Sequence, residues 1–77
     1  MEIKVLGMGC VKCKTTYVVI ENVIKEHNIN ANLTKVEDIM EIMNYNILAT
    51  PAVVVDGEVK IVGRVPGERE VKELLGV

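Results

Sequence analysis

The chain has 77 residues, of which 49% are hydrophobic and 26% charged, and its formal net charge is −2 at pH 7. This length predicts one small domain, residues 1–77, and no segment reaches the ~20 apolar residues that a membrane-spanning helix needs. A slightly acidic chain with only two aromatic residues, both tyrosine, also lacks the basic patch and stacking side chains of a nucleic-acid surface. We therefore expect a monomer without nucleic-acid or membrane partners.

The amino-terminal segment MEIKVLG predicts a short strand. Ile3, Val5 and Leu6 form an apolar run within residues 2–6, and Gly7 ends it. The segment has neither the basic region nor the long apolar region of a secretory signal. We therefore expect the protein in the cytoplasm.

The stretch from Val11 to His27 predicts the longest helix. No Gly or Pro interrupts it, and its apolar side chains recur at three- and four-residue steps, which places them on one face. That face comprises Cys13, Thr16, Tyr17, Ile20, Val23, Ile24 and His27. The opposite face is charged and places Glu21 and Lys25 at the i,i+4 spacing of a surface ion pair.

The middle of the chain predicts an edge strand and then a short helix. Residues 31–36 alternate loosely between apolar and polar side chains, and Asp38 is a suitable N-cap for a helix that runs to about Tyr45. We expect this helix to bury Ile39, Met40, Ile42 and Met43. The two methionines are therefore interpreted as core residues and not as copper ligands.

The stretch TPAVVVDGEVKIVG predicts a β-hairpin. Ala52–Val55 has the continuous apolar pattern of a buried central strand, and Asp56-Gly57 is typical of a two-residue hairpin turn. In the returning strand Val59 and Ile61 alternate with charged residues. The segment VPGERE opens a last helix, which we expect to bury Val71, Leu74 and Leu75.

These elements predict an α/β fold with the order β-α-β-α-β-β-α and a four-stranded mixed sheet flanked by helices. The first helix joins two parallel strands, and the hairpin adds two more strands to the same sheet. Cys10 and Cys13 then lie where the first strand ends and the first helix begins. This is the carboxyl edge of the sheet, where small α/β folds place their sites.

The spacing of Cys10 and Cys13 suits a redox-active pair or a metal clamp. A structural disulfide is disfavoured, because cytosolic thiols are kept reduced and so short a loop would restrict the unfolded chain little. The helix amino terminus stabilises a thiolate and so lowers the pKa of Cys10, whereas Cys13 faces the core and keeps a higher pKa. We expect Cys10 to attack a substrate disulfide and Cys13 to resolve the mixed disulfide.

The strand-CxxC-helix opening, Thr50-Pro51 before AVVVDGE, the hairpin and the closing helix together resemble the thioredoxin superfamily. The chain is similar to its short archaeal and bacterial thioredoxin/glutaredoxin-like members, the redox-active disulfide proteins. The resemblance implies a thioredoxin-like fold and a thiol-disulfide oxidoreductase in which Cys10 and Cys13 are catalytic, with no cofactor beyond their disulfide and no metal. It also implies a cis Pro51, substrate binding by Thr50, Pro51 and Gly63, disulfide-containing protein partners, and a thioredoxin-reductase-like electron donor.

Two features depart from the superfamily pattern. Full thioredoxins keep a buried aspartate below the resolving cysteine, but Lys4 occupies that position here, which leaves the proton acceptor for Cys13 unassigned. Val11-Lys12 also replaces the Gly-Pro between the cysteines, and Gly9 replaces the preceding tryptophan.

GMGCVKC also resembles the GMxCxxC motif of heavy-metal-associated domains, with Met8 at the motif's methionine. That alternative implies a Cu(I) carrier, since soft sulfur ligands suit this ion. Those domains, however, have the order β-α-β-β-α-β and end in a strand. A zinc site would need further ligands, and His27 lies about four turns from the cysteines. His27 is expected to be a helix-terminal cation or a partly buried core residue.

Overall fold

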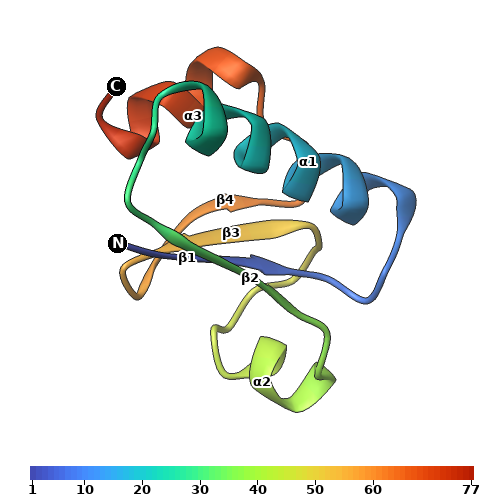
Figure 1. The fold of residues 1–77 in the computed structure, drawn as a ribbon. Coiled ribbons are helices and arrows are strands. Elements are labelled where there is room, and N and C mark those ends of the chain that lie inside the picture. Colours follow the sequence, from blue (N-terminus) through green and yellow to red (C-terminus); the bar gives the residue numbers. More distant parts are fainter.

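The computed structural model describes residues 1–77, and its elements follow the predicted order (Figure 1). They are β1 (Glu2–Leu6), α1 (Val11–Glu26), β2 (Asn32–Val36), α2 (Ile39–Met43), β3 (Ala52–Val55), β4 (Glu58–Val62) and α3 (Glu68–Leu75). The chain ends in a helix after two adjacent strands, which is not the order of a heavy-metal-associated domain. None of the three helices is long and apolar enough to cross a membrane.

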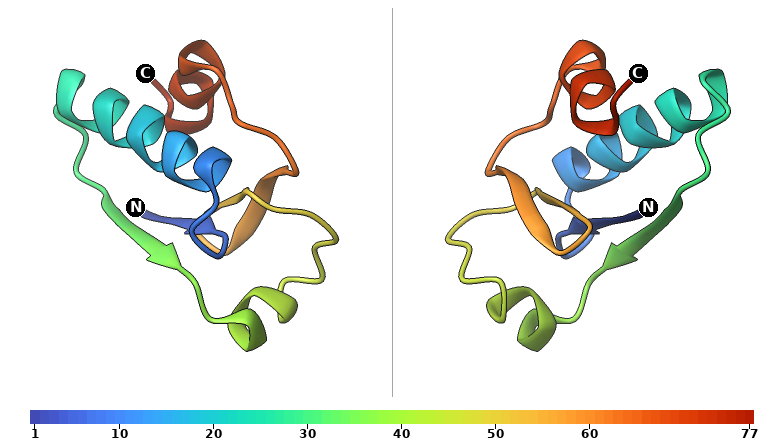
Figure 2. Two further views of the ribbon diagram at one scale, coloured as in Figure 1. Left: turned by 90° about the vertical axis from the view of Figure 1, so that its right-hand side faces the viewer. Right: turned by 90° about the vertical axis from the view of Figure 1, so that its left-hand side faces the viewer.

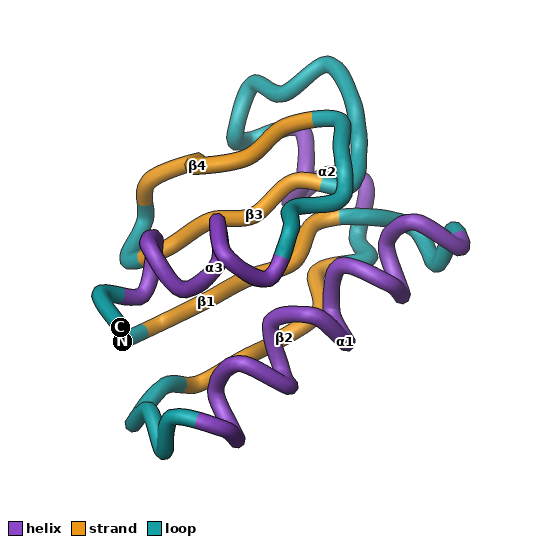
Figure 3. The backbone as a smooth tube through the Cα atoms, turned by 90° about the horizontal axis from the view of Figure 1, so that it is seen from above, coloured by secondary structure: helices purple, strands orange, loops and turns teal.

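The four strands form one mixed sheet in the order β2-β1-β3-β4. β1 runs parallel to β2 and antiparallel to β3, and β3 pairs with β4 in the hairpin. α1 and α3 cover one face of the sheet and α2 covers the other, as the views in Figures 1 and 2 show. The two chain ends lie on the same side of the molecule, opposite the turn between β1 and α1 (Figures 1 and 3).

Each face of the sheet has its own apolar cluster, because successive strand residues point to opposite faces. Under α1 and α3 the cluster consists of Ile3, Val5, Ile20, Val23, Val53, Val55, Ile61, Val71 and Leu75. Under α2 it consists of Leu6, Val36, Ile42, Ala52 and Val54. All four residues of β3 are buried, which confirms the prediction of a central strand.

The hairpin turn is formed as its sequence predicts. Asp56 and Gly57 both have positive φ, 48° and 85°, the conformation that a tight turn of this kind requires. The returning strand differs from the prediction, because the pairing changes register between Val53 opposite Ile61 and Val54 opposite Val59. Lys60 is the additional residue of this β-bulge, so Val59 and Ile61 do not share a face. Ile61 is buried and Val59 is exposed.

The prediction of a largely buried second helix is wrong. Asp38 caps α2 as expected, since its carboxylate accepts a hydrogen bond from the Met40 N–H at 2.9 Å. The helix, however, has only five residues and ends at Met43, so it directs only Ile42 into the core. The remaining predicted core residues are exposed, namely Ile39, Met40 and Met43.

The two longer helices bury most of the residues predicted for them. In α1, Cys13, Thr16, Ile20 and Val23 are buried. Tyr17 and Ile24 are half-buried, and His27 is an exposed C-cap, so the helix-terminal interpretation of His27 is correct and the core interpretation is not. In α3, Val71 and Leu75 are buried, whereas Leu74 at the margin is half-buried.

Candidate functional site

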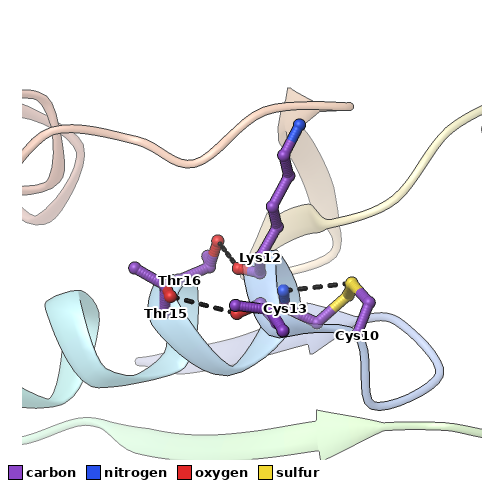
Figure 4. Close-up of a disulfide and its surroundings, with 6 residues drawn as sticks. Cys10, Lys12, Cys13, Thr15 and Thr16 are labelled. Atoms are coloured by element: carbon purple, nitrogen blue, oxygen red, sulfur yellow. Dashed lines mark hydrogen bonds between the residues drawn. A yellow bond between two sulfur atoms is a disulfide. The ribbon is translucent and has the colours of Figure 1, made fainter.

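The two cysteines lie at the predicted place, between the end of β1 and the start of α1. They form a disulfide, and Cys10 is the N-cap of α1 (Figure 4). The Cys10 Sγ accepts a hydrogen bond from the Cys13 backbone N–H at 3.1 Å, which is one of the N–H groups that a helix start leaves without a partner. A thiolate at Cys10 would receive the same N–H and the favourable end of the helix dipole.

The surroundings of the two sulfurs are unequal. Cys10 is exposed, whereas only 6% of the surface of Cys13 is exposed to solvent, because Cys13 lies one turn into the helix on the core face. The first turn of α1 contains no acidic residue, while Lys12 and Lys14 flank the second cysteine. The side chain of Lys12 extends away from β2 in Figure 4. Cys10 is therefore far more accessible from solvent than Cys13.

Gly7, which the sequence suggested only as the end of a strand, is part of the site. It is buried, and a Cβ at this position would overlap the Cys13 sulfur and lie 3.0 Å from the Cys13 Cβ. Its N–H donates to the Val36 carbonyl at 3.0 Å, so the backbone cannot easily retreat from this contact. The absence of a side chain at Gly7 is what allows Cys13 to pack against the end of β1.

The Thr50-Pro51 step lies close to the same turn. Its peptide bond is cis. The Thr50 Cβ is 3.9 Å from the position that a Cβ of Gly7 would occupy, and the Cys13 sulfur adjoins the same position, so Thr50 lies near the buried cysteine. Pro51 is buried and its carbonyl accepts a hydrogen bond from the Gly63 N–H at 2.8 Å. The fold thus brings residues some forty positions apart in the sequence to one edge of the sheet.

Lys4 does not lie beneath the cysteines. Because side chains alternate along β1, Lys4 projects on the α2 face, and its ammonium donates a hydrogen bond to the Tyr45 hydroxyl at 3.3 Å. This hydrogen bond, with smaller contributions from nearby acidic groups, raises the pKa of Lys4. The residue of β1 that does adjoin the Cys13 side of the sheet is Val5, which is apolar and cannot take up a proton.

A small cavity of about 40 Å³ adjoins Cys13. It is lined by Val5, Gly7, Gly9, Cys13, Lys14, Lys35 and Glu37. Lys35 and Glu37 were not predicted as neighbours of the cysteines, although the sequence contained a signal for this proximity. The carboxyl ends of adjacent parallel strands meet at one edge, so the residue after β2 was bound to lie near the residue after β1. The Leu6–Val36 register and the hydrogen bond from Gly7 to Val36 produce this proximity.

No three side chains of the types His, Cys, Asp and Glu lie together in a way that could hold a metal ion. The candidate site consists of the cysteine pair, its helix terminus and the adjoining cavity. The arrangement can carry out thiol-disulfide exchange, which needs an accessible thiolate and a second thiol one helical turn away.

Comparison with known proteins agrees with this chemistry. The family model described as thioredoxin domain matches residues 1–76. A thioredoxin of Methanothermobacter thermautotrophicus is 35% identical over 75 residues, which cover 97% of this chain and 97% of that protein. A thioredoxin of Methanocaldococcus jannaschii is 36% identical over 73 residues, which cover 95% of this chain and 84% of that protein. The chain belongs to the thioredoxin family and is a thiol-disulfide oxidoreductase with a redox-active CxxC disulfide.

Proposed function

We propose that the protein reduces disulfides by a two-step exchange in which Cys10 attacks and Cys13 resolves. The Cys10 thiolate attacks one sulfur of the substrate disulfide, and the other sulfur leaves as a thiolate. Cys13 then loses its proton and attacks the Cys10 sulfur of the mixed disulfide. The second substrate sulfur leaves, and the protein is left with the Cys10–Cys13 disulfide after transferring two electrons.

The observation that carries this assignment is the unequal placement of the two sulfurs. Cys10 is exposed at the helix N-cap with its sulfur on the Cys13 N–H, whereas Cys13 is buried. A helix terminus favours the thiolate that acts as nucleophile, and burial protects the other thiol from outside disulfides. The dithiol itself holds the two electrons, so the proposal includes no further cofactor.

We also propose that a substrate segment docks along Thr50, Pro51 and Gly63. Thr50 is exposed, and no backbone hydrogen bond engages its N–H or carbonyl, so both groups are available to an extended peptide. The Gly63 N–H already bonds to the Pro51 carbonyl, which fixes the two segments against each other at 2.8 Å. A Cβ added at Gly63 would lie only 3.1 Å from the Ala49 Cβ, so there is little room for a side chain at this position.

The proposed chemistry also indicates the partners and the compartment of the protein. A dithiol that reduces others must be reduced again, so the proposal includes a thioredoxin-reductase-like electron donor and disulfide-containing protein substrates. The cytoplasm is the compartment proposed, because cytosolic thiols are kept reduced. We further propose that residues 1–77 work as one monomeric domain, since a single sheet carries both apolar clusters.

Trapping of the mixed disulfide tests the assignment. Cys13→Ser should accumulate mixed disulfides with a disulfide-containing protein, because the attacking thiol is present and the resolving thiol is absent. Cys10→Ser, which retains only the buried thiol, should accumulate none. Non-reducing gels with and without a final reduction measure the adducts. The opposite pattern would exchange the two roles, and adducts with neither variant would refute thiol-disulfide exchange at this pair.

A further inference from the structure

Cys13 must lose a proton before it can resolve the mixed disulfide, because the thiolate and not the thiol is the nucleophile. Neither candidate on β1 can accept that proton. Lys4 is a cation on the opposite face of the sheet, where it is hydrogen-bonded to Tyr45. Val5 lines the cavity beside Cys13 but is apolar. An acceptor, if the chain supplies one, must come from another element.

Glu37 is the one carboxylate that lines the cavity next to Cys13. It directly follows β2, whose last residue pairs with the last residue of β1, and alternation along β2 places it on the same face as Lys35 and α1. The Glu37 Oε2 lies 3.5 Å from the position that a Cβ of Gly9 would occupy, so the carboxylate adjoins the cysteine turn.

The charged groups around Glu37 leave its carboxylate free. Lys14 from α1 and Lys35 from β2 also line the cavity, but neither forms an ion pair with it. The Lys35 ammonium instead lies 4.8 Å from the centre of the Tyr17 ring. The adjacent acid, Asp38, is occupied as the N-cap of α2. Glu37 therefore remains available as a proton acceptor.

The cavity can hold a relay between the two groups. Its volume of about 40 Å³ admits a water molecule, and the residues that line it include Cys13, Glu37 and two lysines, Lys14 and Lys35. The contact of Gly7 with Cys13 limits how far this sulfur can shift from the cavity.

We propose that Glu37 accepts, through a water molecule in this cavity, the proton that Cys13 loses when it resolves the mixed disulfide. The inference rests on the proposed roles of the two cysteines. The Cys13 S–H bond breaks, the proton passes by way of the water to the Glu37 carboxylate, and the Cys13 thiolate forms its bond to the Cys10 sulfur. The bond between Cys10 and the substrate sulfur breaks, and the departing thiolate can take the proton from Glu37 or from solvent.

Rapid mixing of the reduced protein with a large excess of 5,5′-dithiobis(2-nitrobenzoate) separates the two steps. Attack by Cys10 releases a first equivalent of coloured thiolate, and resolution by Cys13 releases a second. The leaving group needs no proton, so the second phase reports deprotonation of Cys13 and its attack. Glu37→Gln should slow the second phase at neutral pH roughly ten- to a hundredfold and leave the first phase nearly unchanged. A hundredfold is about the smallest rate effect typical of a positioned general base.

The pH profile distinguishes proton transfer from other roles. The deficit of Glu37→Gln should shrink at pH values above the ordinary thiol pKa of about 8.5, where solvent removes the proton without help. Glu37→Asp should recover part of the rate. Glu26→Gln removes the same charge from an exposed position at the far end of α1 and should change neither phase.

Three results would overturn the proposal. A second phase that is unchanged or faster in Glu37→Gln would show that the carboxylate acts only by its charge, which disfavours the Cys13 thiolate, or not at all. A deficit that persists undiminished at high pH would indicate a structural role. Absence of the first phase in the unmodified protein would refute attack by Cys10, and with it both the proposed function and the step that Glu37 serves.

Discussion

The backbone of Gly7 and the side chain of Cys13 are in direct contact, so closely that a Cβ on Gly7 would overlap the Cys13 sulfur. The end of the first strand thus sets the position of the buried cysteine. This contact links the stability of the fold to the chemistry of the site, and it can be tested by adding a single methyl group.

Gly7→Ala should lower the free energy of unfolding by roughly 1–3 kcal/mol, the usual loss when a methyl group is forced into a packed site. It should also slow the release of the second equivalent in the two-phase thiol assay more than the first, because Cys13 is the residue displaced. Gly67→Ala is the control, since a Cβ there meets no atom within 4 Å. Equal effects of the two substitutions would show that the Gly7–Cys13 contact does not restrict the site.

Lys4→Gln should leave both phases of the thiol assay within about twofold of the unmodified protein, because Lys4 is half-buried on the far face of the sheet and its charge is directed away from the cysteines. The substitution does remove the hydrogen bond to Tyr45. Stopped-flow absorbance under the conditions used for Glu37→Gln makes the comparison direct. A second phase slowed as much as in Glu37→Gln would show that Lys4 takes part in the deprotonation of Cys13 and would contradict this prediction.

The second helix offers a matched pair of substitutions. Ile42→Ala should lower the free energy of unfolding by roughly 2–4 kcal/mol, because Ile42 is its single buried residue and fills the cluster under α2. Met43→Gln, at the next position and exposed, should change it by no more than about 0.5 kcal/mol. Urea unfolding followed by circular dichroism measures both. Comparable losses would mean that Met43 packs against the protein after all.

The ion pair between Arg64 and Glu70 predicts a pH dependence of stability. The Arg64 guanidinium hydrogen-bonds both Glu70 oxygens and so lowers the pKa of Glu70. A lowered pKa in the folded state means that the stabilisation is complete above the ordinary glutamate pKa and is lost as the pH falls through the lowered value. The stability advantage over Glu70→Gln should therefore be constant near neutrality and decline as the pH falls below the ordinary glutamate pKa of ~4.3.

Urea unfolding at a series of pH values measures this advantage. Glu73→Gln, on the same helix but without an ion-pair partner, is the control for the loss of a carboxylate. A gap between the unmodified protein and Glu70→Gln that does not change with pH would contradict a salt bridge in solution.

Patterns that depend on neighbouring residues were readable in the sequence. The three- and four-residue spacing of apolar side chains predicted α1, the continuous run Ala52–Val55 predicted the central strand, and Asp56-Gly57 predicted the hairpin. The residues next to Cys10 in the sequence also placed it at a helix amino terminus, because the glycines before it end β1 and an uninterrupted helical segment follows it. These features follow from backbone preferences and periodicity, which require no knowledge of distant contacts.

Other features failed in prediction because they depend on packing. Whether Met40 and Met43 were buried depended on the length of α2 and on where its one turn meets the sheet. Whether Val59 and Ile61 shared a face depended on a bulge that forms only when β4 pairs with β3. Neither pairing register nor helix placement can be read from spacing along one segment.

The sequence by itself determined the order of the elements, the cysteine pair at the start of a helix and its likeness to thioredoxins. Only the tertiary structure decided which groups surround Cys13. Lys4 lies on the opposite face of the sheet because side chains alternate along β1. Gly7 and Glu37 lie at the site because β1 and β2 pair in parallel. The physical reason is that a sheet edge collects residues from separate strands, and the register that aligns them is fixed by long-range hydrogen bonds and burial.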